Sequence, residues 1–469
     1  MSDLNKVLEM IKENDARYVD FRFTDPRGKW HHLARHVSSV DKDSLSKGVM
    51  FDGSSVPGWA ANDRSDLALV PDPSSAVMDP FSAQPQLILI CDVHQAGTGQ
   101  AYARDPRSCA GRAEAHLKTT GIGDAAYFGL MAAFFVFDDV GFEVSANHSF
   151  FRLGAEEGPS HAGDGLVDGR TGHRPATGGG YVPVPPVDQG MDLRAEMGTV
   201  MTEMGLKIEQ HHHEVAACQH RLGLRRATLL RGADNMQIYK YCVQMVAHSY
   251  GKTATFMPKP VMDEAGSGLD CHQSIWKAGK PTFAGKGAAD LSQAALFYIG
   301  GLVKHAAAIS AFANPTTNSY KRLVPDLEAP ILLAYSARNR SAACAMPRAA
   351  GPEGRRVVLR TPDPSANPYL ACAAMLMAGL DGIENKTRPG EPMDKSLYDL
   401  SPEELDEMPT VCGSLPEALE ALDADREFLK AGQVFSDDLI DAYLELKWDE
   451  VSRLERTPHP VEYALYYSV

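Results

Sequence analysis

The stretch ANPTTNSYKRLVPDLEAPILLAYSARNRSA, residues 313–342, places several basic side chains on loops between apolar segments. Three of them are arginines, whose planar guanidinium groups suit phosphate and carboxylate: Arg322, Arg338 and Arg340. Glu328 lies in the short loop 326–328, which could close over a ligand. The pattern indicates an active site that handles anions. A solvated run of surface charge is the alternative interpretation, since arginine is common on protein surfaces.

Composition and charge describe a soluble globular protein. The chain has 469 residues, of which 44% are hydrophobic and 23% are charged, enough for one large domain or two to three ordinary ones. The net charge of -15 is spread along the chain, which argues against nucleic acid and against a membrane as partners. No apolar run approaches the roughly 18 residues of a membrane span, and the N-terminus reads as an acidic amphipathic helix. We therefore expect a cytoplasmic protein.

Generic ligand motifs are few. The eight cysteines form no CxxC pair, so buried free thiols are expected and a disulfide framework or zinc site is not. GKT at 251–253 lacks the upstream glycine of a phosphate-binding loop. The run HHHE at 211–214 resembles a metal cluster, but alternation along a strand lets only His212 and Glu214, or His211 and His213, share a face. Histidines satisfied within the structure are the alternative.

The first hundred residues are predicted to form a small β-rich unit. Residues 18–24 alternate in polarity, the turn DPRG at 25–28 is typical of a hairpin, and 86–93 is a second apolar strand. A Gly/Ser/Pro loop at 51–59 carries Asp52. A helix beginning at DPRS, residues 105–108, marks the expected boundary of this unit.

The rest of the chain alternates strands and helices. Strands are predicted at 127–137 and 207–215, and helices at 193–206, 234–250, 292–312 and 368–380. The last helix has Asn367 as its cap and Pro368 as its first residue. The Gly/Pro-rich stretch 153–188 is predicted to be a long loop.

The segments NPTTNSYKRLVP, EAP and SARNRSA closely resemble the corresponding segments of type I glutamine synthetase of the bacterial, adenylylated kind. The resemblance covers essentially all 469 residues. It implies an α+β fold with a small N-terminal β-grasp-like domain, residues 1–104. The implied larger domain, residues 105–469, is a catalytic-type α/β domain with antiparallel strands that form a funnel. It also implies a C-terminal tail, TPHPVEYALYYSV, that interlocks the two rings of a double hexamer.

In that family, glutamates on the funnel strands bind Mg²⁺ or Mn²⁺, and most of those positions differ here. The family strand FGxExEFF reads FGLMAAFF, with Met131 and Ala133 in place of two glutamates. The glutamate of RRxEVRFPDP aligns with Val358. An arginine of the family's phosphate site aligns with Ala345, and an asparagine of its glutamate site aligns with Ala265. Oxygen ligands for a hard cation are therefore lost.

Two acidic positions remain beside a new cation. Glu214 of HHHE matches a family metal ligand, and the histidine of GSGxHCH aligns with Asp270. The next family glutamate aligns with Arg221, after a one-residue deletion. We expect Arg221 to pair with Glu214 and the residual site to hold no metal, because the remaining charges can neutralise one another. A single-ion site formed by Glu214 and Asp270 is the alternative.

Other family positions are intact, and the resemblance implies their roles. The catalytic positions are Asp52, which would come from a neighbouring subunit and help deprotonate ammonium, Glu328 of a closing flap, and Arg340. The substrate-binding positions are Gly266, Arg322 and Arg360, and the nucleotide-binding positions are His272 and Ser274. Tyr398 of SLYDL matches a modified tyrosine of some members, and an ordinary exposed tyrosine is the alternative.

These substitutions favour the hypothesis of a homologue that has lost catalysis and acts through assembly, ligand sensing or an active paralogue in nitrogen metabolism. The charge clamp that they remove is usually the largest electrostatic contribution to catalysis. On this hypothesis the protein is not an enzyme and binds no cofactor tightly. The alternative is an active or weakly active ligase that forms glutamine from glutamate and ammonia, uses ATP with Mg²⁺ or Mn²⁺, and has an altered metal site.

Overall fold

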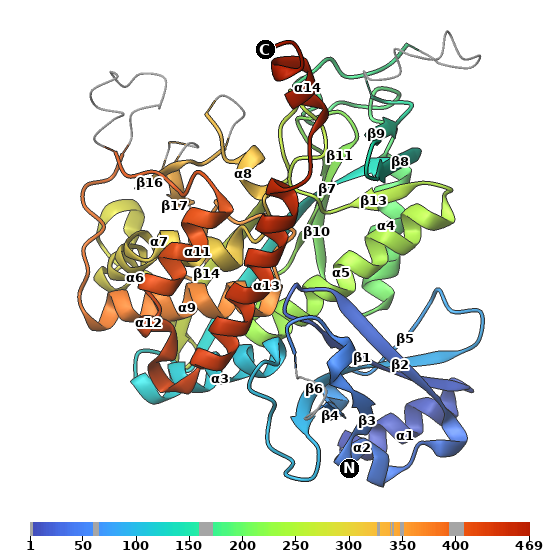
Figure 1. Cartoon of the computed structure of the whole chain (residues 1–469). Coiled ribbons are helices and arrows are strands. Elements are labelled where there is room, and N and C mark those ends of the chain that lie inside the picture. Colours follow the sequence, from blue (N-terminus) through green and yellow to red (C-terminus); the bar gives the residue numbers. More distant parts are fainter. Residues whose placement is uncertain are drawn as a thin grey trace.

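The chain forms two units of unequal size. The computed structural model describes residues 3–59, 65–158, 172–325, 329–337, 339, 342–347, 351–393 and 408–469. Figure 1 shows the small N-terminal unit in blue at the lower right and the larger unit, which carries the rest of the chain, above and beside it. Helix α3 (Pro106–Thr120) begins where the sequence predicts, with the side chain of Asp105 as its cap. The boundary between residues 104 and 105 stays a prediction.

The N-terminal unit is a six-stranded sheet in the order β2-β1-β6-β4-β3, with β5 paired to β6. Its strands are β1 (Tyr18–Thr24), β2 (Trp30–His36), β3 (Val49–Asp52), β4 (Asp66–Pro71), β5 (Val77–Met78) and β6 (Gln86–Gln95), and its helices are α1 (Asp3–Glu13) and α2 (Lys42–Lys47). Strand β1 runs antiparallel to β2 and parallel to β6. The predicted hairpin turn is present: Gly28 takes a left-handed φ of 87°, which glycine adopts without a steric cost.

The larger unit is organised around a ten-stranded sheet in the order β10-β11-β7-β14-β18-β17-β16. Its strands are β7 (Ala125–Phe137), β10 (Ile208–His213), β11 (Gln219–Leu224), β12 (Ala227–Thr228), β13 (Thr253–Thr255), β14 (Leu269–Lys277), β15 (Lys280–Pro281), β16 (Leu332–Ser336), β17 (Ala342–Ala345) and β18 (Val357–Leu359). All neighbouring pairs are antiparallel except β16 and β17, which run parallel. The antiparallel funnel strands are therefore present, with one parallel pair at the edge.

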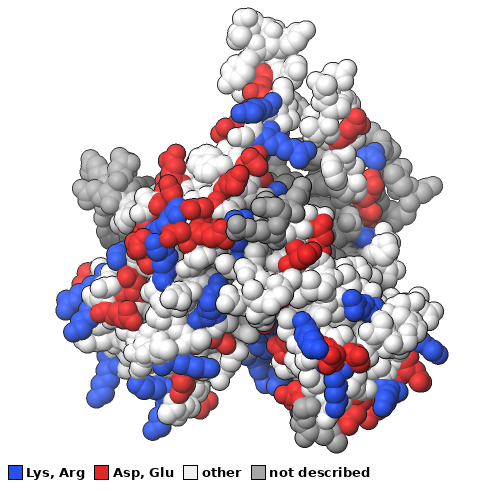
Figure 2. Space-filling view, turned by 60° about the horizontal axis from the view of Figure 1, so that its bottom comes forward, with Lys and Arg blue, Asp and Glu red and all other residues white. Residues whose placement is uncertain are grey.

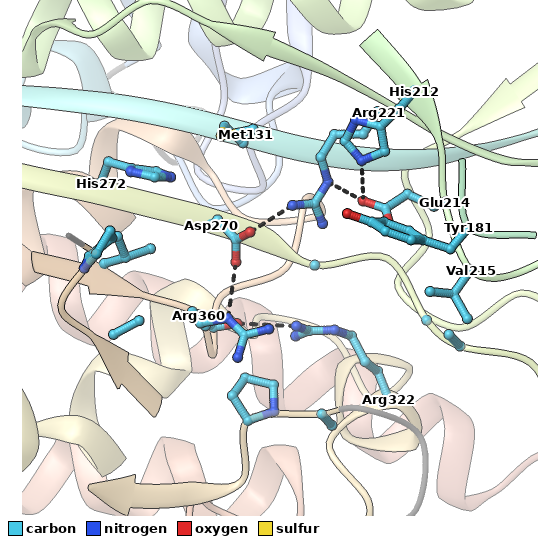
Figure 3. A pocket seen from close by; sticks show the side chains of 18 of the residues that line it. Met131, Tyr181, His212, Glu214, Val215, Arg221, Asp270, His272, Arg322 and Arg360 are labelled. Carbon is cyan, nitrogen blue, oxygen red and sulfur yellow. Dashed lines mark hydrogen bonds and ion pairs between the residues drawn. The ribbon is translucent and has the colours of Figure 1, made fainter. Parts of the chain in front are cut away.

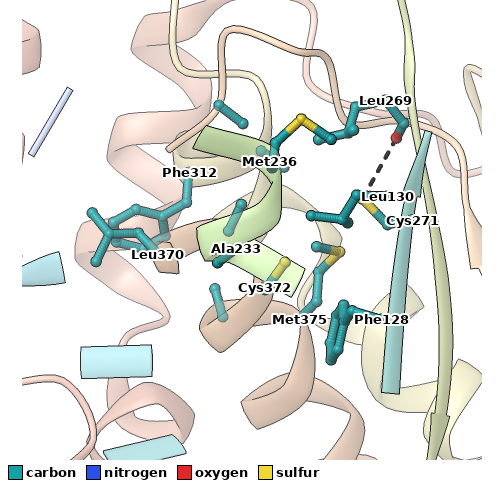
Figure 4. Packing of buried hydrophobic residues seen from close by; sticks show 14 of the residues in the cluster. Phe128, Leu130, Ala233, Met236, Leu269, Cys271, Phe312, Leu370, Cys372 and Met375 are labelled. Atoms are coloured by element: carbon teal, nitrogen blue, oxygen red, sulfur yellow. Dashed lines mark hydrogen bonds between the residues drawn. The ribbon is translucent and has the colours of Figure 1, made fainter. Parts of the chain in front are cut away.

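Helices cover one face of this sheet and bury the main core. They include α4 (Met191–Glu203), α5 (Leu229–Ser249) and α9 (Pro368–Glu384). Figure 4 shows side chains of β7 and β14, among them Phe128 and Cys271, packed against Met236 of α5 and Met375 of α9. Side chains with even numbers on β7 face these helices, so those with odd numbers face the opposite side of the sheet. All eight cysteines are free and buried, as the sequence predicts.

The prediction of one long helix over residues 292–312 is wrong. The structure has two helices, α6 (Gln293–Lys304) and α7 (Ala306–Ala313), which meet at an angle of 75°. At the break, the His305 ring lies 2.9 Å from Asp381 Oδ2 and 2.6 Å from Asp425 Oδ2. These contacts turn the chain although the apolar pattern continues through it.

The C-terminal part adds further helices over the core and ends in an exposed tail. These are α8 (Ser319–Arg322), α11 (Leu415–Ala424), α12 (Glu427–Lys430), α13 (Asp437–Glu455) and α14 (Pro460–Tyr466). Helix α14 projects from the top of the molecule in Figure 1. Tyr463 and Leu465 on it are 59% and 61% exposed, and Tyr467 directly after it is 81% exposed. The hairpin of β8 (Asp139–Val144) and β9 (Ser149–Gly154) is likewise exposed, with Phe142 at 76%.

The described residues contain no single helix long and apolar enough to cross a membrane; only the bent pair α6 and α7 meets the criteria of length and composition. On the face shown in Figure 2, basic and acidic side chains are interspersed over both units. That distribution fits the net charge of -15, which is spread along the chain.

Candidate active site

A cavity of about 610 Å³ opens in the larger unit, on the sheet face away from the core helices; we call it the funnel cavity. Residues from strands β7, β11, β14, β17 and β18 line it, together with the segment after β10 and the glycine-rich segment 265–268. The sheet register brings distant sequence positions together there. Asp270 pairs with Met131, His272 pairs with Val358, and Arg221 pairs with both Ala133 and His212.

The centre of the cavity is a guanidinium group between two carboxylates (Figure 3). Arg221 Nε lies 2.5 Å from Glu214 Oε1, and Arg221 Nη1 donates a hydrogen bond of 2.6 Å to Asp270 Oδ2. The three side chains are 15%, 13% and 22% exposed, in the order Arg221, Glu214 and Asp270. The expected pair of Arg221 with Glu214 is therefore present, and Asp270 joins it.

The charges of this triad hold both acids ionised. Burial raises the pKa of Glu214, but the hydrogen bond from His212 and the charge of Arg221 outweigh it, so the pKa lies below its usual value. Burial likewise raises the pKa of Asp270, and the charges of Arg221 and Arg360 bring it below its usual value. His212 Nε2 lies 3.4 Å from Glu214 Oε1, so this strand face carries His212 with Glu214, as alternation predicts.

Arg322 brings a second, deeply buried cation to the cavity. Its side chain is 7% exposed, and its Nη atoms donate to backbone carbonyls: Arg360 O, Thr361 O and Pro362 O at 3.1, 2.8 and 3.3 Å. Burial lowers the pKa of Arg322 to about 10, which still leaves it charged at neutral pH. No carboxylate among the described residues pairs with it within 4.0 Å. A buried cation whose described hydrogen-bond acceptors are all carbonyls favours an anionic ligand.

The glycine-rich segment allows the chain to approach Arg322 closely. A Cβ atom on Gly266 would lie 2.6 Å from Pro258 O and 2.8 Å from Arg322 Cγ, and one on Gly268 would lie 2.6 Å from Arg322 Nη2. Any larger residue would displace the guanidinium. Arg360 also lines the cavity, with its Nε 3.8 Å from Asp270 Oδ1. The structure thus brings together all three predicted substrate-binding residues: Gly266, Arg322 and Arg360.

The two predicted nucleotide-binding residues lie along the same face of β14. His272 lines the cavity, and its Nδ1 accepts a hydrogen bond of 2.7 Å from Arg356 Nε. Burial and the charge of Arg356 lower the pKa of His272 to about 4, so the ring is neutral at pH 7. Ser274 lies two residues further along the strand, is 3% exposed and accepts from Trp276 Nε1 at 3.3 Å. It is not among the residues that line the cavity.

The described residues do not fit a divalent cation held by the protein alone. No group of three or more His, Cys, Asp or Glu side chains among them is placed to hold a metal ion. Glu214 and Asp270 both direct oxygens to Arg221. The substituted positions Met131 and Val358 line the cavity without supplying an oxygen ligand.

The other predicted residues lie in the N-terminal unit or outside the described residues. Asp52 ends strand β3 in the N-terminal unit, is exposed, and accepts hydrogen bonds from Ser54 N and Oγ at 2.9 and 2.7 Å. These bonds lower its pKa. Glu328, Arg340 and Tyr398 lie outside the described residues, as does Arg338.

Sequence reasoning missed one residue that lines the cavity and one that contacts its lining. Tyr181 lines it from the long loop before α4, with its ring centroid 6.0 Å from that of His212. Arg356 orients the His272 ring from outside the cavity. The Gly/Pro composition around Tyr181 indicates a loop, but nothing in it indicates which strand the loop crosses. The pair of arginines at 355 and 356 shows no periodicity that distinguishes it from surface charge.

Comparison with known proteins identifies the family. The family profile described as "Glutamine synthetase, catalytic domain" matches residues 103–466, and "Glutamine synthetase, beta-Grasp domain" matches residues 15–96. The chain is 61% identical to a glutamine synthetase of Azospirillum brasilense and 58% identical to one of Rhizobium meliloti, in both cases over 469 residues and 100% of both chains. A solved Plasmodium falciparum glutamine synthetase is 28% identical with a TM-score of 0.90, and the match covers 100% of this chain and 99% of that one.

The hypothesis that catalysis is lost, and with it the prediction that the protein is not an enzyme, is contradicted by this full-length similarity to glutamine synthetases. The hypothesis gave a few substituted positions more weight than the whole chain. It also equated the loss of carboxylates with the loss of charge stabilisation, although Arg221 brings a positive charge to the same place. The chain belongs to the glutamine synthetase family, with an N-terminal β-grasp domain followed by a glutamine synthetase catalytic domain.

Proposed function

We propose that this protein is an ATP-dependent ligase that forms glutamine from glutamate and ammonia, with an altered metal site. The observation that carries the proposal is the 61% identity to a protein named glutamine synthetase over all 469 residues. The funnel cavity supports it, because Arg221, Arg322 and Arg360 line it together and guanidinium groups suit the carboxylate and phosphate groups of such substrates.

Each intact position has a role in this proposal. Arg322 and Arg360 bind substrate carboxylate or phosphate oxygens, beside Gly266, which leaves room for them. His272 and Ser274 contact the nucleotide, and the neutral His272 ring can accept or donate a hydrogen bond there. Glu328 closes the site and Arg340 stabilises negative charge. Asp52 of a neighbouring subunit supplies an ionised carboxylate that attracts ammonium, which fits its lowered pKa.

Use of ATP with Mg²⁺ or Mn²⁺ is part of the proposal and follows from family membership. Mg²⁺ in proteins is commonly held by one or two carboxylates together with substrate phosphates. The described residues therefore leave the nucleotide phosphates as the main source of oxygen ligands for any divalent ion. No step of the reaction is assigned to an ion at Glu214 and Asp270.

We further propose a cytoplasmic homo-oligomer with the double hexameric ring that the resemblance implies. The exposed apolar side chains of α14 support it, because a free, solvated chain end does not usually carry so many. Asp52 also supports it, because it does not line the cavity of its own chain. Tyr398 as a site of adenylylation stays a prediction.

A steady-state assay for glutamine tests the function. The protein is incubated with glutamate, ammonium and ATP, with Mg²⁺ or Mn²⁺, and glutamine is quantified. We expect ATP-dependent and ammonium-dependent turnover of about 1 s⁻¹ or more, the lower end of typical enzyme values. Arg322→Gln should reduce the turnover at least about 100-fold. Arg225→Gln, which changes an exposed arginine paired with Glu209, should leave it unchanged. Glutamine at background level with both metals would overturn the proposal.

A further inference from the structure

The Glu214–Arg221–Asp270 triad occupies the space where the two retained acids would share a cation. Glu214 follows β10, Arg221 lies on β11 and Asp270 on β14, so three separate segments converge on one guanidinium. A divalent ion needs oxygen ligands at about 2.0 to 2.6 Å. The nearest oxygens of both acids are instead 2.5 and 2.6 Å from Arg221 nitrogens. A metal ion would have to displace a fixed positive charge that repels it.

The surrounding strands hold Arg221 in this position. Ala133, which pairs with Arg221 across β7 and β11, is 1% exposed and leaves space for the side chain without competing for it. On the other side of the site, Asp270 lies opposite Met131, whose Cε would be 3.3 Å from a Cβ on Gly223. The Arg221 side chain thus lies on strands whose register neighbours are small or apolar, its guanidinium lies between Glu214 and Asp270, and the side chain is only 15% exposed.

The charges of the cavity favour an anion in the absence of any metal. Its described lining carries three arginines, Arg221, Arg322 and Arg360, and two carboxylates, Glu214 and Asp270. The lining therefore has a net charge of about +1 when its histidines are neutral. Among the described residues, the Arg322 guanidinium donates hydrogen bonds only to backbone carbonyls, and the charges of Asp363 and Asp270 act on it without an ion pair within 4.0 Å. Low exposure strengthens the attraction of such a site for a negative ligand.

One guanidinium nitrogen remains for that ligand. Arg221 engages Glu214 through Nε and Asp270 through Nη1, and no described residue accepts a hydrogen bond from its Nη2. In Figure 3 this nitrogen faces the open middle of the cavity, between Asp270 and Tyr181 and on the side of Arg322.

We infer that Arg221 takes the place of a bound cation, so that the funnel cavity binds a phosphate or carboxylate anion without a divalent ion at Glu214 and Asp270. The inference goes beyond the proposed function, because it concerns the binding of an oxyanion and not turnover. It holds whether or not glutamine is formed. The positive charge at this place therefore belongs to the Arg221 side chain, and a chelator cannot remove it.

Calorimetric titration of the intact protein with inorganic phosphate tests this inference. We expect the same affinity, within about twofold, in EDTA and in excess Mg²⁺. Titration with succinate in EDTA shows whether the site also takes a carboxylate, and tighter binding of either probe identifies the preferred oxyanion. Binding of both probes only when Mg²⁺ is present would overturn the inference.

Variants at position 221 test the role of the guanidinium. Arg221→Gln removes the charge and should weaken phosphate binding at least 10-fold in EDTA, whereas Arg221→Lys should retain part of it. Arg225→Gln should bind as the unchanged protein does. Circular dichroism confirms that each variant is folded. Equal affinity of the unchanged protein and Arg221→Gln would overturn the inference.

Manganese binding gives a readout that needs no anion. Electron paramagnetic resonance measures bound Mn²⁺. We expect the unchanged protein and Glu214→Gln to bind the same amount, because Glu214 holds no metal ion in the unchanged protein. Arg221→Glu would place a third carboxylate beside Glu214 and Asp270 and should create a site for one Mn²⁺ per chain. A stoichiometric Mn²⁺ site in the unchanged protein that disappears in Glu214→Gln would refute the exclusion of the metal. The glutamine assay is separate, so failure of the proposed function and failure of this inference give different results.

Discussion

Arg107 on α3 holds Asp234 on α5 through two parallel hydrogen bonds, each of 2.9 Å. The same guanidinium donates to Asp92 at 2.8 Å and to Asp72 at 2.7 Å, both in the N-terminal unit. Arg107 is 2% exposed, so one buried cation ties the two units together. Bidentate pairs of this kind combine strength with geometric specificity.

Arg107→Ala should therefore destabilise the protein by about 3 to 5 kcal/mol, because it leaves the buried carboxylate of Asp234 without its cation. Denaturant unfolding measures the free energy of unfolding. Lys47→Ala provides the control, since its pair with Asp43 has side chains 75% and 71% exposed, and such pairs contribute at most about 1 kcal/mol. A loss below about 1 kcal/mol for Arg107→Ala would contradict the prediction.

Asp105→Asn should stabilise the protein at pH 7.5. Burial, and then the charge of Asp92, raise the pKa of Asp105 to about 6 in the folded protein, from an ordinary value of 3.8. The folded state therefore binds the proton more tightly, and the stability that this contributes at low pH is lost as the pH rises through 6. Asn removes the buried charge and still caps α3.

The gain for Asp105→Asn should be at most about 3 kcal/mol above pH 6. It should shrink steadily as the pH falls from 6 towards the ordinary pKa of 3.8, because the unfolded state then also takes up the proton. Thermal unfolding of both proteins between pH 4 and pH 8 measures the difference. A pH-independent difference would show that the charge of Asp105 is not the cause.

Gly301→Ala should destabilise the protein because α6 and α9 meet at this glycine. A Cβ there would lie 2.0 Å from Ala378 O and 2.8 Å from Gly382 N, both backbone atoms that cannot move aside. We expect a loss of about 1 to 3 kcal/mol or more. Gly198→Ala in α4 is the matched control, since its Cβ would meet only side-chain atoms at 3.8 and 4.0 Å. The control should gain about 0.4 to 1 kcal/mol, and equal effects of the two changes would refute the packing argument.

Deletion of residues 457–469 should divide a large assembly into smaller species. Helix α14 exposes apolar and aromatic side chains along its length, and such a surface is expected to be buried by a neighbouring chain. Light scattering measures the mass. The circular dichroism of the catalytic unit should change little, because α14 buries no residue against its own chain. An unchanged mass would exclude the tail from the assembly.

Local signals predicted several elements to within a residue. Strand β1 begins and ends where its alternation does, at Tyr18 and Thr24. Helix α9 begins at Pro368 because Asn367 caps it, and the sequence contains both signals. The break at His305 could not be predicted, because it depends on Asp381 and Asp425, which lie 76 and 120 residues away along the chain.

The candidate site was predictable only in part. The resemblance indicated that Glu214, Arg221 and Asp270 converge, and alternation indicated that His212 shares a face with Glu214. That Arg221 bridges both acids depends on the pairing of β7 with β11 and with β14, which no local pattern specifies. The inference from lost ligands to lost activity failed because it counted carboxylates and did not weigh the charge that had replaced them.

Because all eight cysteines are buried, their reactivity depends on local opening of the folded protein. Burial raises the pKa of thiols such as Cys91 and Cys372, and a buried, protonated thiol reacts slowly with alkylating reagents. Cys91 lies in the core of the N-terminal unit and Cys372 in that of the catalytic unit. The rate at which each thiol is alkylated under native conditions therefore reports how often its own unit opens. Both rates can be measured in the same protein without introducing a substitution.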